Sequence, residues 1–218
     1  MPSAAEWRLF LPNENGCGRP PPYPEARTLL AIVDDVPPVA RTDVYLKADA
    51  NVGVKRRGGR GLEIKALKQR QTLGGGVGPG AADIFAKVKL DDDASPADVL
   101  EQLRKEAASG GGGGAGVSEE LGALMTNPLE VRVEKSVRKV DVGVGEGTVS
   151  FEVTDVTVDF AEIPEGHPKN WITFCAEGTL ESMERFLEGK GRPLVALFSL
   201  REALQAGYPR FVQIMSTA

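Results

Sequence analysis

One segment of this chain, from Arg41 to Arg70, is basic although the chain as a whole is acidic. The segment holds nine Lys or Arg and three Asp or Glu, whereas all 218 residues hold 26 basic and 31 acidic residues. Its cations fall at alternate positions of stretches with strand character, and side chains at i and i+2 of a strand point to the same face. The alternation predicts an anion held against one face of a sheet, rather than a general affinity for polyanions.

The composition narrows the class of protein. A chain of 218 residues can bury a substantial core, and we expect one domain over residues 1–218, with glycine-rich insertions near 74–80 and 109–116. A sequence pI near 5.1 makes nucleic acid an unlikely partner. Two cysteines cannot form a disulfide framework, and no apolar run approaches the ~20 residues of a membrane span. A cytoplasmic protein with no membrane partner is predicted, and a nuclear or organellar location is left open.

Turn residues divide the chain into short β-rich segments. Strands are predicted at 6–11, 42–47, 52–57, 61–67, 131–144, 148–160 and 171–177. Helices are predicted at 97–107, 118–125, 180–187 and the second half of 193–204, while 26–33 and 208–214 fit either a helix or a strand. Seven or eight strands joined mostly by short turns favour an antiparallel meander or barrel with a few outer helices. The predicted fold class is therefore α+β, mainly β.

The predicted strands carry charge on faces that are not fully polar. Lys55 and Arg57 share one face of their strand, as do Glu63 and Lys65 on the next. The valines and the Leu and Ile of these two strands take the opposite faces. In a half-buried sheet these charges would point to solvent, which is the simpler interpretation of any single strand. Because the pattern recurs on nearly every strand, a closed eight-stranded barrel with a charged interior explains it better. Charges inside a barrel must pair with one another or bind a ligand.

The order and chemistry of these segments resemble the CYTH-domain family, also called triphosphate tunnel metalloenzymes. The segments that carry the resemblance are AEWRLFL, DVYL, VGVKRRG, LEIKAL, VRVEKSVRKV, SFEVTDVTVDF and WITFCAEG, followed by a helix. The resemblance implies an antiparallel eight-stranded tunnel that binds a triphosphate through lysines and arginines and holds Mg²⁺ or Mn²⁺ through carboxylates. Family members hydrolyse tripolyphosphate, thiamine triphosphate or nucleoside triphosphates, and some make cyclic AMP.

The resemblance also implies a set of functional residues. The first strand of the family carries Glu-x-Glu-x-Lys, which aligns best with Ala4, Glu6 and Arg8; a register with Glu6 at the first carboxylate fits less well. A late Glu-x-Glu pair aligns with Cys175 and Glu177, so two carboxylates are missing. The residues implied in triphosphate binding are Arg8, Lys55, Arg57, Lys65 and, as alternatives one register apart, Arg138 and Lys135. Those implied in metal binding are Glu6, Asp159 and Glu177, and those implied in catalysis are Glu6 and Lys65.

Two functions of different class fit this partial match. One is a metal-dependent triphosphatase, a phosphoric anhydride hydrolase in which cations and the metal stabilise the charge on the phosphates. The other is a catalytically inactive domain that binds phosphates or serves as a protein-interaction module. A nucleic-acid-binding barrel ranks third, because only Tyr45 lies among the cations as a surface on which bases could stack.

Overall fold

The computed structural model describes residues 5–16, 18–48, 52–58, 61–73, 80–90, 131–159, 168–200 and 203–217, together with Asp98, Glu101 and Lys105. Those three isolated residues are helical and belong to the predicted helix 97–107, of which the rest lies outside the described residues. The insertion near 109–116, the predicted helix 118–125 and the insertion near 74–80 except Gly80 also lie outside them.

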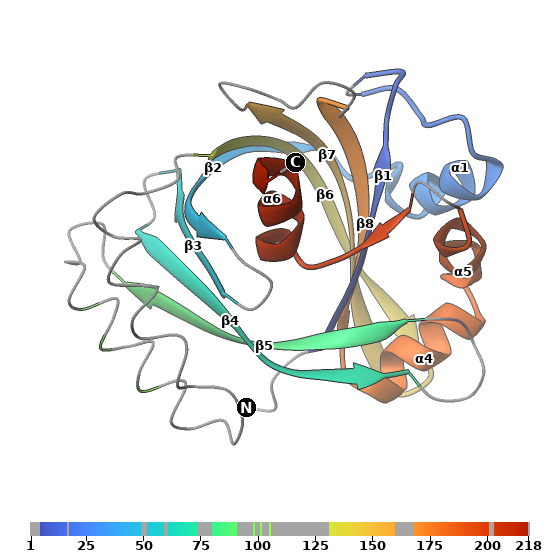
Figure 1. The fold of residues 1–218 in the computed structure, drawn as a ribbon. Helices are drawn as coiled ribbons and strands as arrows, with labels where there is room; N and C mark the ends of the chain where they lie inside the picture. The colour runs from blue at the N-terminus through green and yellow to red at the C-terminus, as the bar shows by residue number, and fades with distance from the viewer. Residues whose placement is uncertain are drawn as a thin grey trace.

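Eight long strands close into an antiparallel barrel (Figure 1). Their order around the barrel is β1-β5-β4-β3-β2-β6-β7-β8, and β8 returns to β1. Their bounds are β1 (Ala5–Pro12), β2 (Val39–Ala48), β3 (Val52–Arg57), β4 (Leu62–Thr72), β5 (Ala81–Leu90), β6 (Val131–Val144), β7 (Gly147–Asp159) and β8 (Asn170–Gly178). The predicted closed eight-stranded barrel is confirmed, and so is the mainly β fold class.

Strand β5 was not predicted from the sequence, and β4 is longer than predicted. The segment after Gly80 carries only a weak β signal, because alanine and lysine are depleted in strands. The helix expected in the second half of 193–204 is also wrong, since helix α5 (Arg192–Phe198) occupies the first part of that stretch. Pro193 explains this placement, because proline is favoured in the first turn of a helix.

The barrel closes at a short seam between β1 and β5. Only Ala5 and Glu6 of β1 pair with β5. Further along the same edge of β1, the two-residue strand β9 (Leu204–Gln205) pairs with Leu9 and Phe10. The side-chain amide of Gln205 also donates a hydrogen bond to the carbonyl oxygen of Ala81 at 2.9 Å. The segment before the last helix therefore satisfies backbone groups that the β1–β5 pairing leaves open.

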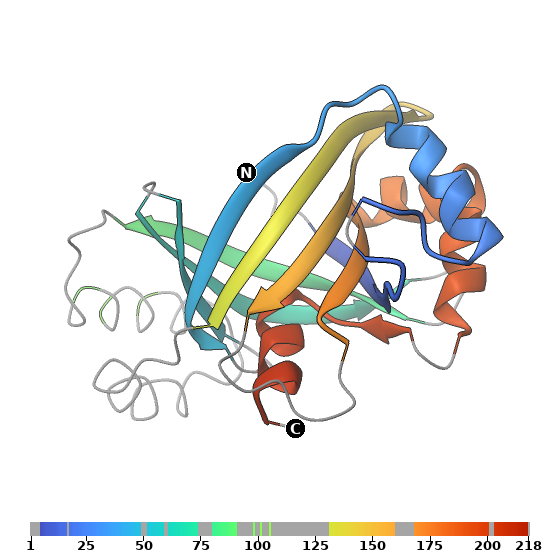
Figure 2. The same cartoon turned by 90° about the horizontal axis from the view of Figure 1, so that it is seen from above.

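Three helices and a single 3₁₀ turn cover the outside of the barrel at β1 and β6–β8 (Figure 2). They are α1 (Pro24–Leu30), η1 (Ala31–Val33), α4 (Leu180–Glu188) and α5. The hydroxyl of Thr179 accepts a hydrogen bond from the backbone N–H of Ser182, so Thr179 caps the N-terminus of α4. The ambiguous segment 26–33 is helical. None of the described helices is long and apolar enough to cross a membrane.

The last helix, α6 (Tyr208–Thr217), lies against the inner wall at one end of the barrel (Figure 1). Its residues Tyr208 and Phe211 pack on Phe10, and Phe211 also meets Trp171 edge to face. Gly53 of β3 permits this approach, because a Cβ there would lie 2.6 Å from the ring of Pro209. The segment 208–214, ambiguous in the sequence, is thus a helix that fills one end of the barrel with an apolar cluster.

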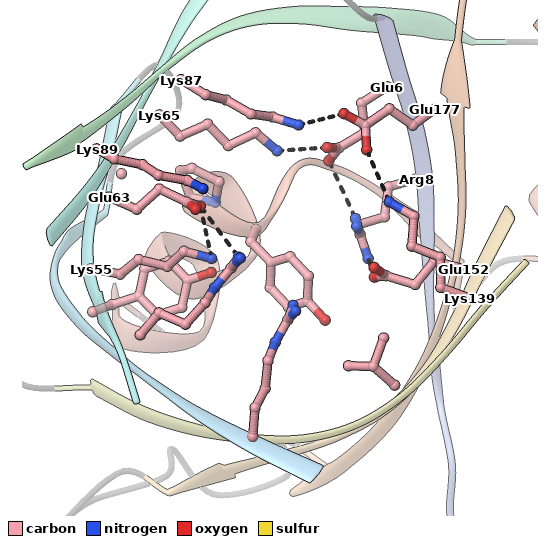
Figure 3. Close-up of a pocket in the computed structure, with 17 residues that line it drawn as sticks. Glu6, Arg8, Lys55, Glu63, Lys65, Lys87, Lys89, Lys139, Glu152 and Glu177 are labelled. Atoms are coloured by element: carbon pink, nitrogen blue, oxygen red, sulfur yellow. Dashed lines mark hydrogen bonds and ion pairs between the residues drawn. The ribbon is translucent and has the colours of Figure 1, made fainter. Parts of the chain in front are cut away.

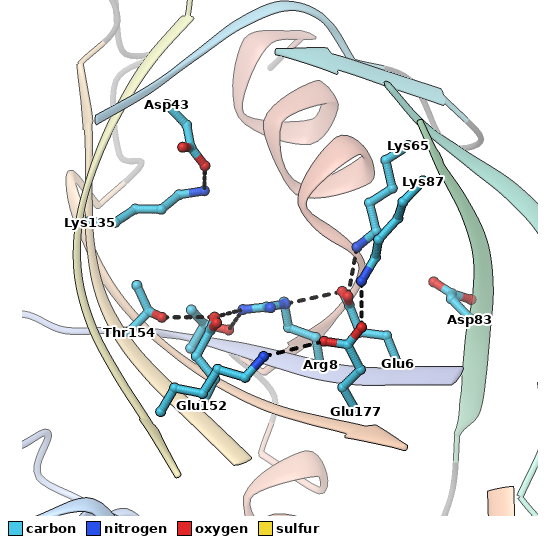
Figure 4. A network of polar contacts seen from close by, with 12 residues as sticks. Glu6, Arg8, Asp43, Lys65, Asp83, Lys87, Lys135, Glu152, Thr154 and Glu177 are labelled. Atoms are coloured by element: carbon cyan, nitrogen blue, oxygen red, sulfur yellow. Dashed lines mark hydrogen bonds and ion pairs between the residues drawn. The ribbon is translucent and has the colours of Figure 1, made fainter. Parts of the chain in front are cut away.

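The remainder of the barrel has its apolar side outward and its charged side inward. Trp7, Leu9 and Leu11 of β1 belong to the outer cluster under the helices, and Val54 and Ile64 belong to a second outer cluster on β2–β5. The alternate residues of the same strands point into the barrel, as two views of the interior show (Figures 3 and 4). The faces of β3 and β4 that carry Lys55, Arg57, Glu63 and Lys65 line this charged interior, as predicted.

Candidate functional site

The charged side of the barrel interior encloses a cavity of about 370 Å³ (Figure 3). Eight cations line it: Arg8, Arg41, Lys55, Arg57, Lys65, Lys87, Lys89 and Lys139. Four carboxylates line it with them: Glu6, Glu63, Glu152 and Glu177. The described residues of the lining therefore carry a formal charge of +4, in a chain whose net charge is −5. We call this space the central cavity.

At one side of the central cavity, four cations surround the buried carboxylate of Asp43. Its Oδ2 atom accepts hydrogen bonds from the amines of Lys135 and Lys55, at 2.6 and 3.0 Å. The Nε atoms of Arg57 and Arg41 lie 3.6 and 3.8 Å from its Oδ1 atom. Burial alone would raise the pKa of Asp43, but Lys135 and Lys55 outweigh it and hold that pKa well below its ordinary value. We call these five residues the Asp43 cluster.

Lys135 is the most enclosed cation of the Asp43 cluster. Its side chain has no exposed area, and its amine lies 3.5 Å from the ring centre of Tyr208 and 5.3 Å from that of Tyr45. Burial, together with the charge of Lys55, lowers the pKa of Lys135 well below its ordinary value. Asp43 and, from the neighbouring strand, Glu63 supply two carboxylates for four cations, so this region has a formal excess of positive charge.

Glu63 bridges two members of the Asp43 cluster from the neighbouring strand. Its Oε1 atom lies 3.2 Å from the amine of Lys55 and 3.3 Å from Nη2 of Arg57. Strands β3 and β4 are neighbours, with Lys55 directly opposite Glu63. Strand periodicity predicted that Lys55, Arg57 and Lys65 could converge with Glu63. Lys55 and Arg57 meet this carboxylate, whereas Lys65 pairs with Glu6 instead.

A second group, which we call the carboxylate cluster, comes from strands β1, β7 and β8 (Figure 4). Its members are Glu6, Glu152 and Glu177, and each is held by cations. Glu6 accepts a hydrogen bond from the amine of Lys65 at 2.7 Å, and Glu177 accepts one from the amine of Lys87. Glu6 and Glu152 both accept hydrogen bonds from a single guanidinium, that of Arg8, and Glu152 also accepts one from the hydroxyl of Thr154 at 3.0 Å.

Arg8 is the central cation of this second group. Its Nε donates to Glu6 at 3.3 Å, and its Nη1 donates to Glu152 at 3.1 Å and to Thr173 at 3.3 Å. The ring of Tyr208 lies 4.5 Å from its guanidinium carbon. Burial alone would raise the pKa of Glu152, yet the charge of Arg8 outweighs it and lowers that pKa to about 2. Lys65 and Arg8 likewise hold the pKa of Glu6 below its ordinary value despite burial.

Several buried polar atoms around the central cavity have no hydrogen-bond partner. Among the described residues these are Nε of Arg41, Nε of Arg57, Oδ1 of Asp43 and Oη of Tyr208, and a fifth such atom lies elsewhere, in Asn13. Arg41, Arg57 and Tyr208 line the central cavity. An unpaired buried donor costs about 1–3 kcal/mol. Arg41, Arg57 and Tyr208 thus leave three donors without a hydrogen-bond partner around one cavity.

The structure brings most of the residues predicted for the site together. Glu6, Arg8, Lys55, Arg57, Lys65 and Glu177 all line the central cavity. Of the two alternatives on β6, Lys135 is the residue that points inward and reaches Asp43. The roles assigned to these residues in binding, metal coordination and catalysis stay predictions.

Arg138 and Asp159, also predicted for the site, lie outside the central cavity. Residues 131, 133, 135 and 137 of β6 are buried, so the period of two turns Arg138 to the outer face. There it lines a separate pocket of about 310 Å³ with Arg27 and Asp155. Asp159 is exposed at the end of β7, opposite Arg132 in the register. The prediction that these two residues face the interior is wrong. On both strands, the residues that alternate with them are the ones that point inward.

Other residues of the interior were not predicted for the site. The charged ones are Arg41, Asp43, Lys87, Lys89, Lys139 and Glu152, and the neutral one is Tyr208. Asp83, Phe85, Lys87 and Lys89 alternate along β5, and this period of two is the signal that could have identified the strand and its lysines. No local signal points to Glu152 or Tyr208, because their partners lie far away in the sequence.

The interior does not offer a ready site for a divalent metal. Within the described ranges, no group of three or more His, Cys, Asp or Glu residues is placed to hold a metal ion. Cys175 points into the barrel between Arg8 and Glu152, but burial raises the pKa of its thiol, so it stays protonated and does not replace a carboxylate. The carboxylates present are already held by lysine and arginine. As arranged, the side chains do not fit Mg²⁺ or Mn²⁺, which prefer free carboxylate oxygens.

Comparisons with known proteins include a distant structural likeness. No protein-family model matches the sequence, and no curated protein matches it. A crystal structure of a Bacillus halodurans protein, described as a candidate adenylate cyclase, aligns with 97% of this chain and 98% of its own at 12% identity and a TM-score of 0.39. A likeness this distant bears on neither function nor substrate. The closed barrel with inward cations is the arrangement that the CYTH resemblance implies, and membership of that family stays a prediction.

Proposed function

We propose that the central cavity binds a small polyanion of the triphosphate class, such as tripolyphosphate or the phosphate chain of thiamine triphosphate or a nucleoside triphosphate. The observation that carries this proposal is the formal charge of +4 on the lining of an interior cavity in a chain of net charge −5. An excess of buried positive charge is costly unless an anion compensates it. The volume of about 370 Å³ lies within the ~300–1,000 Å³ of small-molecule sites.

The polarity of the cavity lining supports a phosphate chain over a neutral ligand. The unpartnered atoms of Arg41, Arg57 and Tyr208 are all hydrogen-bond donors, and phosphate oxygens are acceptors. Arg41 and Arg57 also hold their guanidinium groups just beyond hydrogen-bond distance of Asp43. A ligand could therefore accept from Nε of both arginines while Nη2 of Arg57 keeps its hydrogen bond to Glu63, and arginine suits phosphate because its planar group presents several donors.

The proposal is tested by calorimetric titration of the purified protein with tripolyphosphate, thiamine triphosphate and ATP. We expect saturable binding of at least one of them at low salt, weakened as ionic strength rises because charges drive it. Inorganic sulfate at equal ionic strength is the control for general screening. Absence of binding to all three, in EDTA and in excess Mg²⁺ alike, would contradict the proposal and would favour a protein-interaction module.

Hydrolysis of the bound triphosphate is a second candidate function. The observation in its favour is that Glu6 and Glu177 lie directly opposite each other on β1 and β8, both facing the central cavity. A bound phosphate chain would compete for Lys65 and Lys87 and could release the two carboxylates from their present partners. Phosphate release from the three compounds, measured with Mg²⁺ and with Mn²⁺, decides between an enzyme and a binding protein. Equal rates for wild type and Glu6→Gln would argue against a role for this carboxylate.

A further inference from the structure

The guanidinium of Arg8 lies at the point where the carboxylate cluster would have to receive a divalent cation. It donates to Glu6 at 3.3 Å and to Glu152 at 3.1 Å, two carboxylates that come from strands β1 and β7. The side chain of Arg8 is only 7% exposed. A group that bridges two carboxylates on separate strands occupies the space between them that a bridging metal would need.

The third carboxylate of the cluster is occupied as well. Glu177 lies opposite Glu6 and is paired with Lys87, while the amine of Lys139 lies 3.7 Å from its other oxygen. Glu6 is held by Lys65 in addition to Arg8. The cluster thus has four cations for three carboxylates, a formal excess of one positive charge.

A divalent cation would meet two physical obstacles in this cluster. It would bring two more positive charges into a buried region that is already positive, and each of its carboxylate ligands would first have to leave an ammonium or guanidinium partner. Mg²⁺ also loses its water reluctantly and needs regular octahedral geometry. Arginine cannot make room by losing its proton, because the guanidinium is effectively always charged in proteins.

We propose that Arg8 stands in place of a divalent cation between Glu6 and Glu152, so that the central cavity takes up its polyanion in the metal-free form. This inference rests on the proposed function, since it concerns the form of the ligand that the same cavity binds. Arg8 then acts as a binding and positioning residue: it keeps the two carboxylates paired, and its ring neighbour Tyr208 fixes its orientation.

The first consequence concerns magnesium in solution. Mg²⁺ binds polyphosphates and cancels part of their charge, so a cavity that relies on lysine and arginine should prefer the free anion. We expect the apparent Kd of wild-type protein for tripolyphosphate to rise roughly tenfold or more from EDTA to excess Mg²⁺, since one or more charge-assisted hydrogen bonds is lost. Binding that is tighter with Mg²⁺, or that occurs only with it, would overturn the inference.

The second consequence is tested without any polyphosphate, by titrating the protein with Mn²⁺ and following free Mn²⁺ by electron paramagnetic resonance. Wild type should show no saturable site. Arg8→Gln leaves Glu6 and Glu152 without the cation that they share, so this variant should gain one Mn²⁺ site. The double variant Arg8→Gln, Glu152→Gln should lose that site again. Arg8→Lys is the matched control, because it keeps a positive charge and should gain none. Circular dichroism of each variant reports whether it is folded.

The outcomes separate this inference from the proposed function. Mn²⁺ binding by the wild type, or equal behaviour of Arg8→Gln and Arg8→Lys, overturns the role of Arg8 even if tripolyphosphate binds. Failure of tripolyphosphate to bind under all conditions overturns the proposed function, whereas the Mn²⁺ titration still reports on Arg8. If Arg8→Gln does not fold, the effect of Mg²⁺ on the wild-type affinity decides the question.

Discussion

The amine nitrogen of Lys135 lies 2.6 Å from Oδ2 of Asp43, and neither side chain has any exposed area. Ninety-two residues separate the two along the chain, and the pairing of β2 with β6 brings them together. A buried pair of this kind gains stability only if both charges stay compensated, because each has lost its contact with water. The pair therefore affects both the stability of the barrel and the charge next to the central cavity.

Replacing Asp43 by Asn should destabilise the protein by about 3–5 kcal/mol, the usual cost of leaving a buried charge without its partner. Lys135 would lose the carboxylate that it contacts, and Lys55 would keep only that of Glu63. The free energy of unfolding from urea titrations measures the effect. Lys135→Met should cost less, because Asp43 keeps Lys55. If Asp43→Asn lowers the free energy of unfolding less than Lys135→Met does, the cavity does not carry the inferred excess of positive charge.

Stability should fall steeply in acid. The pKa of Glu152 is lowered to about 2 in the folded protein, mainly because Arg8 outweighs the effect of burial, and the pKa of Glu6 and of Asp43 is also lowered. A depressed folded pKa means that the stabilisation is complete above the unfolded value near 4.5 and is lost as pH falls toward 2. For Glu152 the loss amounts to about 3 kcal/mol.

Thermal unfolding between pH 7 and pH 2 checks this expectation. Glu152→Gln should lose less stability than wild type over that interval, because it has no carboxylate to protonate at this position. Glu134→Gln, a change at an exposed glutamate of β6, is the matched control and should follow the wild-type curve. If the melting temperatures of Glu152→Gln and wild type fall by the same amount as the pH is lowered, the coupling between Glu152 and Arg8 is disproved.

Arg56 and Arg57 form a natural pair for testing binding in the central cavity. They are adjacent on β3 and point to opposite faces, and only Arg57 lines the cavity. Arg57→Gln should weaken tripolyphosphate binding by about 10- to 100-fold, the equivalent of one charge-assisted hydrogen bond. Arg56→Gln and Arg138→Gln should leave the Kd unchanged in calorimetric titrations. Similar losses for Arg56→Gln and Arg57→Gln would indicate general attraction to a basic surface instead.

Tyr208→Phe should separate ligand binding from stability. The hydroxyl of Tyr208 is buried and has no hydrogen-bond partner in the described part of the structure. Its removal should leave the ligand-free melting temperature unchanged or slightly higher, because an unpaired buried polar group is itself a cost. The rise in melting temperature on adding tripolyphosphate should become smaller. An unchanged rise would mean that the hydroxyl does not contact the ligand.

Part of the site could be predicted from the sequence because strand periodicity is a local property. Lys55, Arg57, Glu63 and Lys65 follow a period of two within single strands, and the short turn between β3 and β4 makes those strands neighbours. Arg138 was misplaced because both faces of β6 carry charge, so the period alone could not say which face is inside. Strand β5 was missed because its residues have weak strand propensity, although they pair with β4 along their full length.

The sequence by itself determined that this chain forms a mainly β barrel with alternating cations turned to one face, since these follow from spacing along single strands. Only the tertiary structure decided which charges meet. The pairs Asp43–Lys135 and Arg8–Glu152 join residues 92 and 144 positions apart, and cross-strand register over such separations depends on how the whole barrel closes. The entry of helix α6 into one end of the barrel was decided in the same way, because the apolar surface that it covers exists only once the barrel has closed.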